Sequence, residues 1–232
     1  MAQQLLLDIL PASQPTFDNL IVGENAAAIN ATMSLRVGQA LYLWGSDGSG
    51  RSHILQAIAS HHQGIYLADD EHQAKQLVEL ANSAHPLPAC VAVDDVQRMN
   101  DSGLAGLFTL YNRWREMASS EQAFRLVCAG DKAPLQMQLR EDVRTRLGWG
   151  AVFRLMPLTD SDKLKALMSY AQTRSMPLSD EVLRWLLTHG SRDIRSLFGV
   201  VDALDRYALA NHRPMTLPLL KSMLAEKSNL LT

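Results

Sequence analysis

Short apolar runs and longer periodic segments alternate over the first two thirds of the chain. Continuous apolar runs at 39–44, 89–93 and 124–129 are typical of strands that are covered on both faces of a parallel sheet. The segments 51–61 and 104–117 instead carry apolar residues at helical spacing. Strands and helices that alternate in this way predict an α/β domain with a parallel sheet flanked by helices.

The pattern changes after Pro157, where only helical periodicity is found. Four segments have this periodicity, and residues suited to N-cap positions stand before them. The segments are 160–174, 180–189, 192–210 and 217–224, and the candidate N-cap residues are Thr159, Ser179, Ser191 and Thr216. We therefore expect residues 1–15 to form a tail, 16–156 an α/β domain and 157–232 a small helical domain.

The composition is that of a globular chain and excludes several classes of protein. Of the 232 residues, 47% are apolar and 20% are charged, enough to bury a core and unlike a disordered chain. The formal net charge of -2 provides no overall positive field that would attract DNA. Cys90 and Cys128 lie in apolar runs, so we expect reduced, buried thiols and a cytoplasmic location. Asp8 and Pro11 interrupt the apolar start of the chain, so we expect neither a signal peptide nor a membrane span.

The first apolar run leads into a glycine-rich loop and then into a helix. The loop fits the phosphate-binding pattern G-x-x-x-x-G-K-[ST], with arginine where lysine is usual. Glycines let successive backbone N–H groups point into one concavity, the following helix adds its positive N-terminal end, and the final serine can ligate Mg²⁺. A simple turn is the alternative interpretation. The loop consists of Gly45, Ser46, Asp47, Gly48, Ser49, Gly50, Arg51 and Ser52.

Arg51 changes the chemistry that we expect of this loop. A lysine is a compact point charge, whereas a guanidinium is a wider, planar fork. Such a fork would crowd or misplace a γ-phosphate. We therefore predict a site that retains a diphosphate and has weak or absent turnover of ATP.

Two carboxylates follow the second apolar run. Asp94 and Asp95 stand where the run ends, and an acid at the carboxyl end of a strand can lie beside Mg²⁺. We expect Asp94 to serve the metal together with Ser52, and Asp95 to position water. Taken alone, two aspartates after a strand are more often a helix N-cap or a turn, but their place downstream of a phosphate loop favours the magnesium site.

Taken together, these motifs resemble the AAA+ family of the bacterial replication initiator DnaA, and most closely its short Hda-type members. The resemblance extends from about Thr16 to the end of the chain, and Hda-type sequences share the arginine in the loop. It implies an AAA+ P-loop NTPase core, a helical lid domain, and ADP or ATP with Mg²⁺ as cofactors. The resemblance rests on residues 16–25, 45–52, 94–95, 126–131, 144–150 and 192–195.

The resemblance implies roles for residues outside the loop. Val22 and Gly23 would line the adenine pocket, and His53, directly after the loop, would be a further nucleotide-binding residue. Asp131 would occupy the first sensor position, and Arg192 the second sensor position in the lid. Without the resemblance, a surface charge in a first helical turn is the favoured interpretation of Arg192.

Arg146 occupies the position of the family's arginine finger. Such an arginine faces the nucleotide of a neighbouring subunit and supplies positive charge during phosphoryl transfer, an effect worth roughly 10³ to 10⁵ in rate. The resemblance thus implies that the chain, holding ADP, docks on ATP-bound DnaA and stimulates hydrolysis of that ATP in trans, as a negative regulator of replication initiation. A solvated helix face carrying Arg144 and Arg146 is the alternative interpretation.

The N-terminal tail carries a sequence similar to the peptide with which many proteins bind the β subunit of bacterial DNA polymerase III, the sliding clamp. An extended segment can insert Leu5, Leu7 and Ile9 into a groove while the Gln4 amide makes hydrogen bonds at its edge. A strand or a core contact is the alternative for such a leucine-rich segment. Beside the DnaA-like motifs clamp binding is favoured, and it would place the protein at the replisome on the nucleoid.

Two other functions stay open at this point. An autonomous AAA+ ATPase of helicase-loader type would hydrolyse ATP on its own, with stimulation by single-stranded DNA. A non-catalytic, nucleotide-stabilised adaptor would sequester DnaA without accelerating hydrolysis. Homo-oligomers are compatible with the sequence as well. Because the chain ends soon after the lid-like helices, without DnaA's C-terminal helix-turn-helix, we expect no direct sequence-specific DNA binding.

Overall fold

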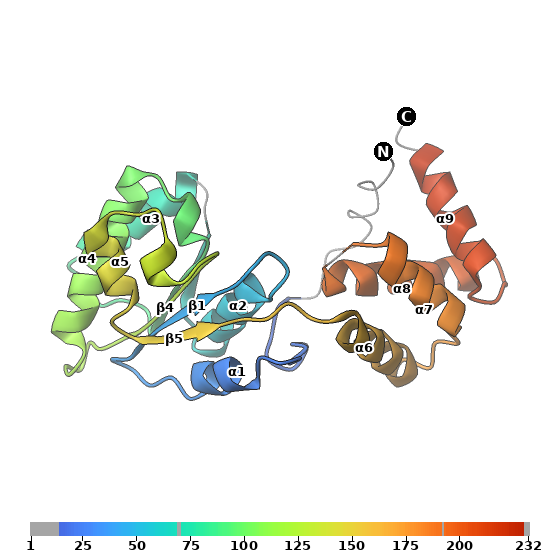
Figure 1. Cartoon of the computed structure of the whole chain (residues 1–232), viewed down its shortest axis with the longest axis horizontal. Coiled ribbons are helices and arrows are strands. Elements are labelled where there is room, and N and C mark those ends of the chain that lie inside the picture. The colour runs from blue at the N-terminus through green and yellow to red at the C-terminus, as the bar shows by residue number, and fades with distance from the viewer. Residues whose placement is uncertain (1–13, 69–70, 192, 230–232) are drawn as a thin grey trace. The chain divides into compact units, whose positions relative to one another are not determined.

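A computed structural model of the chain describes residues 14–68, 71–191 and 193–229 (Figure 1). One compact unit is Pro15–Pro157, and the helices after Leu158 belong to a second. In chain order the first unit contains α1 (Ala26–Met33), β1 (Ala40–Trp44), α2 (Arg51–His61), β2 (Ile65–Leu67), α3 (Glu71–Asn82), β3 (Cys90–Val93), the 3₁₀-helix η1 (Val96–Arg98), α4 (Asp101–Met117), β4 (Arg125–Gly130), the 3₁₀-helix η2 (Pro134–Gln136), α5 (Glu141–Leu147) and β5 (Ala151–Arg154).

The strands of this unit form a parallel sheet in the order β2-β3-β4-β1-β5. At the carboxyl end of β1, Trp44 pairs with Gly130 of β4, and Val93 of β3 pairs with Cys128. The carboxyl ends of β1, β3 and β4 therefore lie side by side. The predicted α/β class with a parallel sheet flanked by helices is confirmed.

Alternation along each central strand divides the core of this unit into two clusters. In β1, Tyr42 is buried on the side of α3, α4 and α5, whereas Leu41 and Leu43 are buried on the side of α1 and α2. The strands β3 and β4 alternate in the same way, because successive side chains point to opposite faces of a sheet. Both faces are covered, which explains why these strands appear in the sequence as continuous apolar runs.

The two cysteines belong to opposite faces of the sheet. Cys90 packs with the α1 and α2 cluster and Cys128 with the α4 cluster, and both are free and fully buried. Burial raises the pKa of each thiol to about 12. Both cysteines thus lie in the core, as predicted.

The second unit contains α6 (Asp160–Thr173), α7 (Asp180–His189), α8 (Ile194–Ala210) and α9 (Leu217–Asn229). Their apolar faces share one cluster, with Leu186, Leu204 and Leu220 at its centre. Thr159 caps α6 in a reciprocal capping box with Asp162.

The N-cap of α7 is as predicted, whereas the start of α8 is not. Ser179 accepts a hydrogen bond from the Val182 N–H and so caps α7. For α8, Asp193 replaces the expected Ser191 as the N-cap residue. The reason is local: the Ser191 hydroxyl accepts the Asp193 N–H, and the Asp193 carboxylate accepts the Arg195 N–H in the first turn of the helix.

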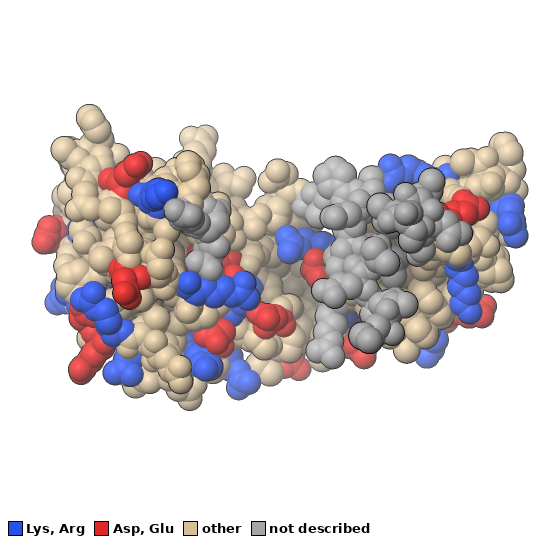
Figure 2. All heavy atoms as spheres, turned by 90° about the horizontal axis from the view of Figure 1, so that it is seen from above, with Lys and Arg blue, Asp and Glu red and all other residues tan. Residues whose placement is uncertain are grey.

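The distribution of charges on the surface and the apolar content of the helices agree with the composition of the chain. On the face shown in Figure 2, basic and acidic side chains are interspersed rather than gathered by sign. Within the described ranges, no helix is long and apolar enough to cross a bilayer.

Candidate nucleotide site

The predicted loop and the predicted acids meet at one edge of the sheet. Because β4 pairs with both β1 and β3, the loop after β1, the aspartates after β3 and Asp131 after β4 leave the sheet at neighbouring positions. Crevices outside the carboxyl ends of strands are the usual ligand sites of open α/β sheets. The fold therefore assembles residues that are about 85 positions apart in the sequence.

The glycine-rich loop has the geometry of a phosphate cradle. Gly48 and Gly50 have φ values of +77° and +93°, which L side chains rarely adopt, and a Cβ at either position would meet no described atom within 4 Å. The Ser49 hydroxyl is buried and has no hydrogen-bond partner among the described residues. Helix α2 begins directly after the loop. Open space, an unpaired hydroxyl and a helix N-terminus together fit a bound phosphate group.

Arg51 folds back beneath this loop. Its side chain is only 7% exposed, and Nη1 donates to the Gly45 carbonyl at 2.7 Å. Nη2 lies 3.2 Å from both the Asp47 and the Asp95 carboxylate. The positive charge expected at a phosphate thus has two acidic partners within the protein itself.

Ser52 and Asp94, the predicted magnesium residues, are brought together around one hydroxyl group. The Tyr66 hydroxyl donates to Asp94 Oδ2 at 2.9 Å, and Ser52 lies beside the same hydroxyl. Burial and the Asp94 carboxylate raise the pKa of Tyr66 to about 12, so the hydroxyl stays protonated. Asp94 itself is 1% exposed and also accepts the Asp95 N–H.

The oxygen atoms of Ser52 and Asp94 suit a hard cation such as Mg²⁺. Within the described part of the chain, no group of three or more His, Cys, Asp or Glu side chains could hold a metal ion. A Mg²⁺ ion at Ser52 and Asp94 would therefore take its remaining ligands from phosphate and water, as Mg²⁺ commonly does.

A glutamine connects the second acid to the sensor position. Asp95 has φ of +45°, and its Oδ1 accepts a hydrogen bond from Gln97 Nε2 at 2.9 Å. Gln97 Oε1 in turn accepts the backbone N–H of Asp131 at 3.2 Å. The ends of β3 and β4 are thus joined by one side chain, with Arg51 bound to the same Asp95 oxygen.

The segment before α1 is anchored to the core at two points. The His53 ring is within 2.8 Å of the Thr16 carbonyl, so this residue fastens the segment to α2. Asn25 is buried, donates to the Met156 carbonyl and accepts the Met156 N–H. Val22 is 43% exposed in the turn between these anchors, and Gly23 follows it with φ of +51°.

Arg146 lies away from the loop, on α5. Its guanidinium lies 3.8 Å above the Phe108 ring centroid and 4.9 Å from that of Trp149. Nε donates to Asn112 Oδ1 at 3.0 Å, and Nη1 donates to the Asp142 carbonyl at 2.9 Å. Neither of these hydrogen bonds uses Nη2. The guanidinium is therefore held in one place with one nitrogen free of these contacts.

Some predicted residues lie outside the described residues. These are Arg192 at the second sensor position and the tail residues Gln4, Leu5, Leu7 and Ile9.

Sequence reasoning missed two side chains of the site, Tyr66 and Gln97. Tyr66 lies in the short strand β2, whose residues are mostly half-buried and give no continuous apolar signal. Gln97 lies in η1, just after the aspartate pair. Its position near the carboxyl end of β3 is the only signal that could have indicated a role.

Comparison with known proteins agrees with this geometry. Residues 160–224 match the family described as Hda, lid domain. Domain III of the Thermotoga maritima initiation protein DnaA has a TM-score of 0.68 at 18% identity, covering 94% of this chain and 98% of that one. The Thermotoga maritima branch-migration motor RuvB has a TM-score of 0.64 at 16% identity, covering 96% of this chain and 73% of that one.

A further solved structure contains a nucleotide analogue. A replication initiator DnaA bound to AMPPCP and single-stranded DNA has a TM-score of 0.64 at 21% identity. It covers 83% of this chain, which spans 65% of the length of that one. These likenesses show the AAA+ fold, which in this chain consists of a parallel sheet flanked by helices and a C-terminal helical lid region. Residues 160–224 thus match the Hda lid domain and the whole chain has a DnaA-like fold, which is consistent with an Hda-type homologue of DnaA.

Proposed function

We propose that this chain is a nucleotide-bound negative regulator of replication initiation that stimulates hydrolysis of DnaA-bound ATP in trans. The lid match and the DnaA-like fold support a regulator related to DnaA. The observation that carries the finer proposal is the placement of Arg146, which is fixed on α5 by two hydrogen bonds and two aromatic rings.

A fixed guanidinium is what an arginine finger requires. Catalysis by a positioned charge depends on donors that need no reorganisation when the reaction occurs. The contacts of Arg146 use Nε and Nη1 and the faces of the rings, so Nη2 is available to a γ-phosphate on the docked initiator. Asn112 and Phe108 belong to α4, so the finger rests on a helix that packs on the sheet.

The chain's own site is proposed to hold ADP with Mg²⁺ and to hydrolyse ATP weakly. The loop backbone and Arg51 would contact the phosphates, Ser52 and Asp94 the metal, and Val22, Gly23 and His53 the nucleoside side of the site. A bound nucleotide supplies phosphate charge that competes with Asp47 and Asp95 for Arg51. Because the guanidinium is already paired with both acids, it lacks the free reach of a lysine toward a γ-phosphate.

The sliding clamp is proposed as the second partner. The support is the sequence of residues 4–9, where a glutamine and three alternate aliphatic residues suit a groove that binds an extended peptide. Clamp loaded on DNA would then bring the chain to the replication fork without a DNA-binding surface of its own.

The test is hydrolysis of ATP bound to DnaA, measured with the full chain, ADP and clamp loaded on DNA. We expect Arg146→Ala to abolish stimulation while nucleotide and clamp binding persist. Arg140→Ala is the matched control, because Arg140 is exposed at the start of the same helix and its side chain pairs with Asp142. It should stimulate as the wild type does.

Other outcomes would support other functions. Full stimulation by Arg146→Ala would refute the finger. Binding of DnaA without faster hydrolysis by the wild-type chain would indicate a sequestering adaptor. Rapid ATP hydrolysis by the isolated chain, stimulated by single-stranded DNA, would indicate an autonomous ATPase.

A further inference from the structure

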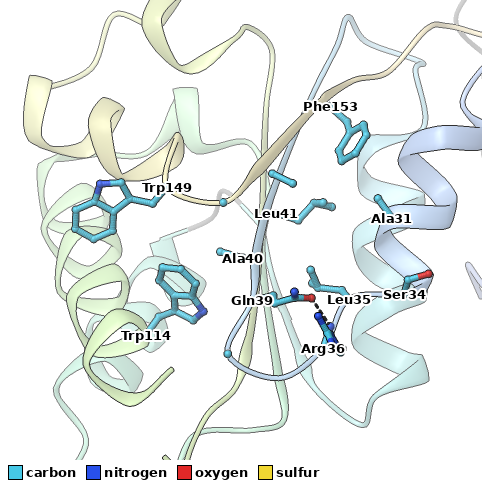
Figure 3. A pocket seen from close by; sticks show the side chains of 13 residues that line it. Ala31, Ser34, Leu35, Arg36, Gln39, Ala40, Leu41, Trp114, Trp149 and Phe153 are labelled. Atoms are coloured by element: carbon cyan, nitrogen blue, oxygen red, sulfur yellow. Dashed lines mark hydrogen bonds between the residues drawn. The ribbon is translucent and has the colours of Figure 1, made fainter. Parts of the chain in front are cut away.

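A pocket of about 640 Å³ lies at the amino ends of β1 and β5, at the edge of the sheet opposite the phosphate loop (Figure 3). The turn between α1 and β1 forms one wall, and α4 with the start of β5 forms the other. The lining is mostly apolar and includes Leu35, Leu41, Phe153, Trp114 and Trp149. Nothing in the proposed regulatory function uses this pocket.

Trp114 brings an unused hydrogen-bond donor to the pocket. The residue is 9% exposed, and its indole nitrogen has no hydrogen-bond partner in the described part of the chain. In Figure 3 this nitrogen lies on the side of the ring that faces Gln39 across the pocket. Buried indole N–H groups usually find an acceptor. An acceptor atom on a ligand would satisfy this one.

The charge at the pocket is positive. Arg36 lines the pocket and is exposed, and within the described residues its guanidinium makes no hydrogen bond or ion pair. The backbone N–H of Arg36 donates to Gln39 Oε1 at 2.9 Å, which fixes the turn that carries it. No Asp or Glu belongs to the described lining. An anion at this site would therefore be attracted by Arg36, and no acidic side chain of the described lining would repel it.

Close packing at the start of β5 keeps the floor of the pocket in place. A Cβ on Gly150 would lie 2.2 Å from the Ala40 carbonyl oxygen, so this position accepts only glycine. The small side chains of Ala40 and Ala151 then leave the space above them open. The volume of the pocket thus depends on the small residues at the starts of β1 and β5.

We propose that this pocket binds a small planar aromatic acid. The volume lies within the roughly 300–1,000 Å³ typical of ligand sites. Tryptophan and aliphatic walls suit a flat apolar body, the Trp114 N–H suits an oxygen acceptor, and Arg36 suits the carboxylate. A neutral aromatic compound would bind through the same walls but gain less from Arg36.

Indole N–H signals in a ¹H–¹⁵N NMR spectrum test this proposal on the full chain. The chain has four tryptophans, and Trp114→Phe assigns one signal. Titration with indole-3-acetate should move the Trp114 signal downfield as the N–H gains an acceptor, while the signal of Trp185 in the helical unit stays in place. Indole-3-acetamide, the neutral isostere, should bind about two- to fivefold more weakly, the range of an ion pair with an exposed arginine.

Two variants and one control test the site without a change to the buried tryptophan. Arg36→Gln should bring the acid and the amide to equal affinity, whereas Arg206→Gln, an exposed arginine of α8, should leave the ratio unchanged. Ala151→Leu should weaken both compounds at least tenfold, because its side chain fills the pocket. An unmoved Trp114 signal at 5 mM acid, or an unchanged ratio in Arg36→Gln, would overturn the proposal. Saturation by an extended apolar peptide but not by the acid would overturn it as well, in favour of a protein partner.

Discussion

Replacing Arg51 by methionine should destabilise the nucleotide-free protein substantially, although the residue stands in a loop associated with binding. Methionine keeps most of the aliphatic stem and removes the guanidinium. The Gly45 carbonyl then loses a buried charged donor at 2.7 Å, and Asp95, whose side chain is 21% exposed, loses a cation at 3.2 Å. Hydrogen bonds to charged groups contribute about 1.5–3 kcal/mol. The Asp47 pair adds at most about 1 kcal/mol, because that carboxylate is 87% exposed.

The expected loss in the free energy of unfolding is therefore about 2–4 kcal/mol. It can be measured by urea unfolding with emission from Trp44, Trp114 and Trp149, which belong to the sheet unit. With an m value of about 2 kcal/mol per molar, the midpoint should fall by roughly 1–2 M. Asp47→Asn is the control and should cost at most about 1 kcal/mol. An Arg51→Met protein within about 0.5 kcal/mol of the wild type would show that the buried guanidinium contributes no net stability, and the reasoning would fail.

Three further outcomes follow from contacts elsewhere in the chain. Tyr66→Phe should lower the free energy of unfolding by about 1–3 kcal/mol, because a buried carboxylate loses its donor; a neutral effect in urea unfolding would contradict this. Thr159→Ala should destabilise the helical unit by about 1 kcal/mol at pH 7. The hydrogen bonds from Thr159 lower the pKa of Asp162, so this carboxylate's contribution is present above its unfolded pKa and is lost as pH falls through the folded value; the gap between variant and wild type should narrow in acid. Cys90 and Cys128, with pKa values of about 12, should react with a thiol reagent at pH 8 only after denaturation, and rapid labelling of the native chain would refute their burial.

Sequence patterns predicted the strands and helices whose structure depends on a single local cause. The apolar runs placed β1, β3 and β4 because both faces of those strands are covered. The helix after the glycine-rich loop was predicted at the bounds that α2 has. The strand β5 gave no such signal, because it lies at the edge of the sheet and its residues are exposed or half-buried.

The sequence predicted that the candidate residues would lie close together but not how their side chains would pair. The loop, Asp94, Asp95 and Asp131 follow strand ends, and that rule alone brings them together. That Arg51 would pair with Asp95, 44 positions away, depends on how far a flexible side chain reaches in three dimensions. The orphan indole of Trp114 is likewise a property of packing between α4 and the α1–β1 turn, and no local pattern encodes it.

Asn25 has a consequence for movement at the point where the chain leaves the sheet unit. Its amide exchanges two hydrogen bonds with the backbone of Met156, which locks that residue to the start of α1. Pro157 follows with a fixed φ, and Leu158 alone separates it from Thr159, the N-cap of α6. The joint therefore has only a few soft backbone torsions. The Asn25 side chain therefore keeps the chain fixed to the sheet unit as far as Met156, and Asn25→Ala should release this last residue before Pro157.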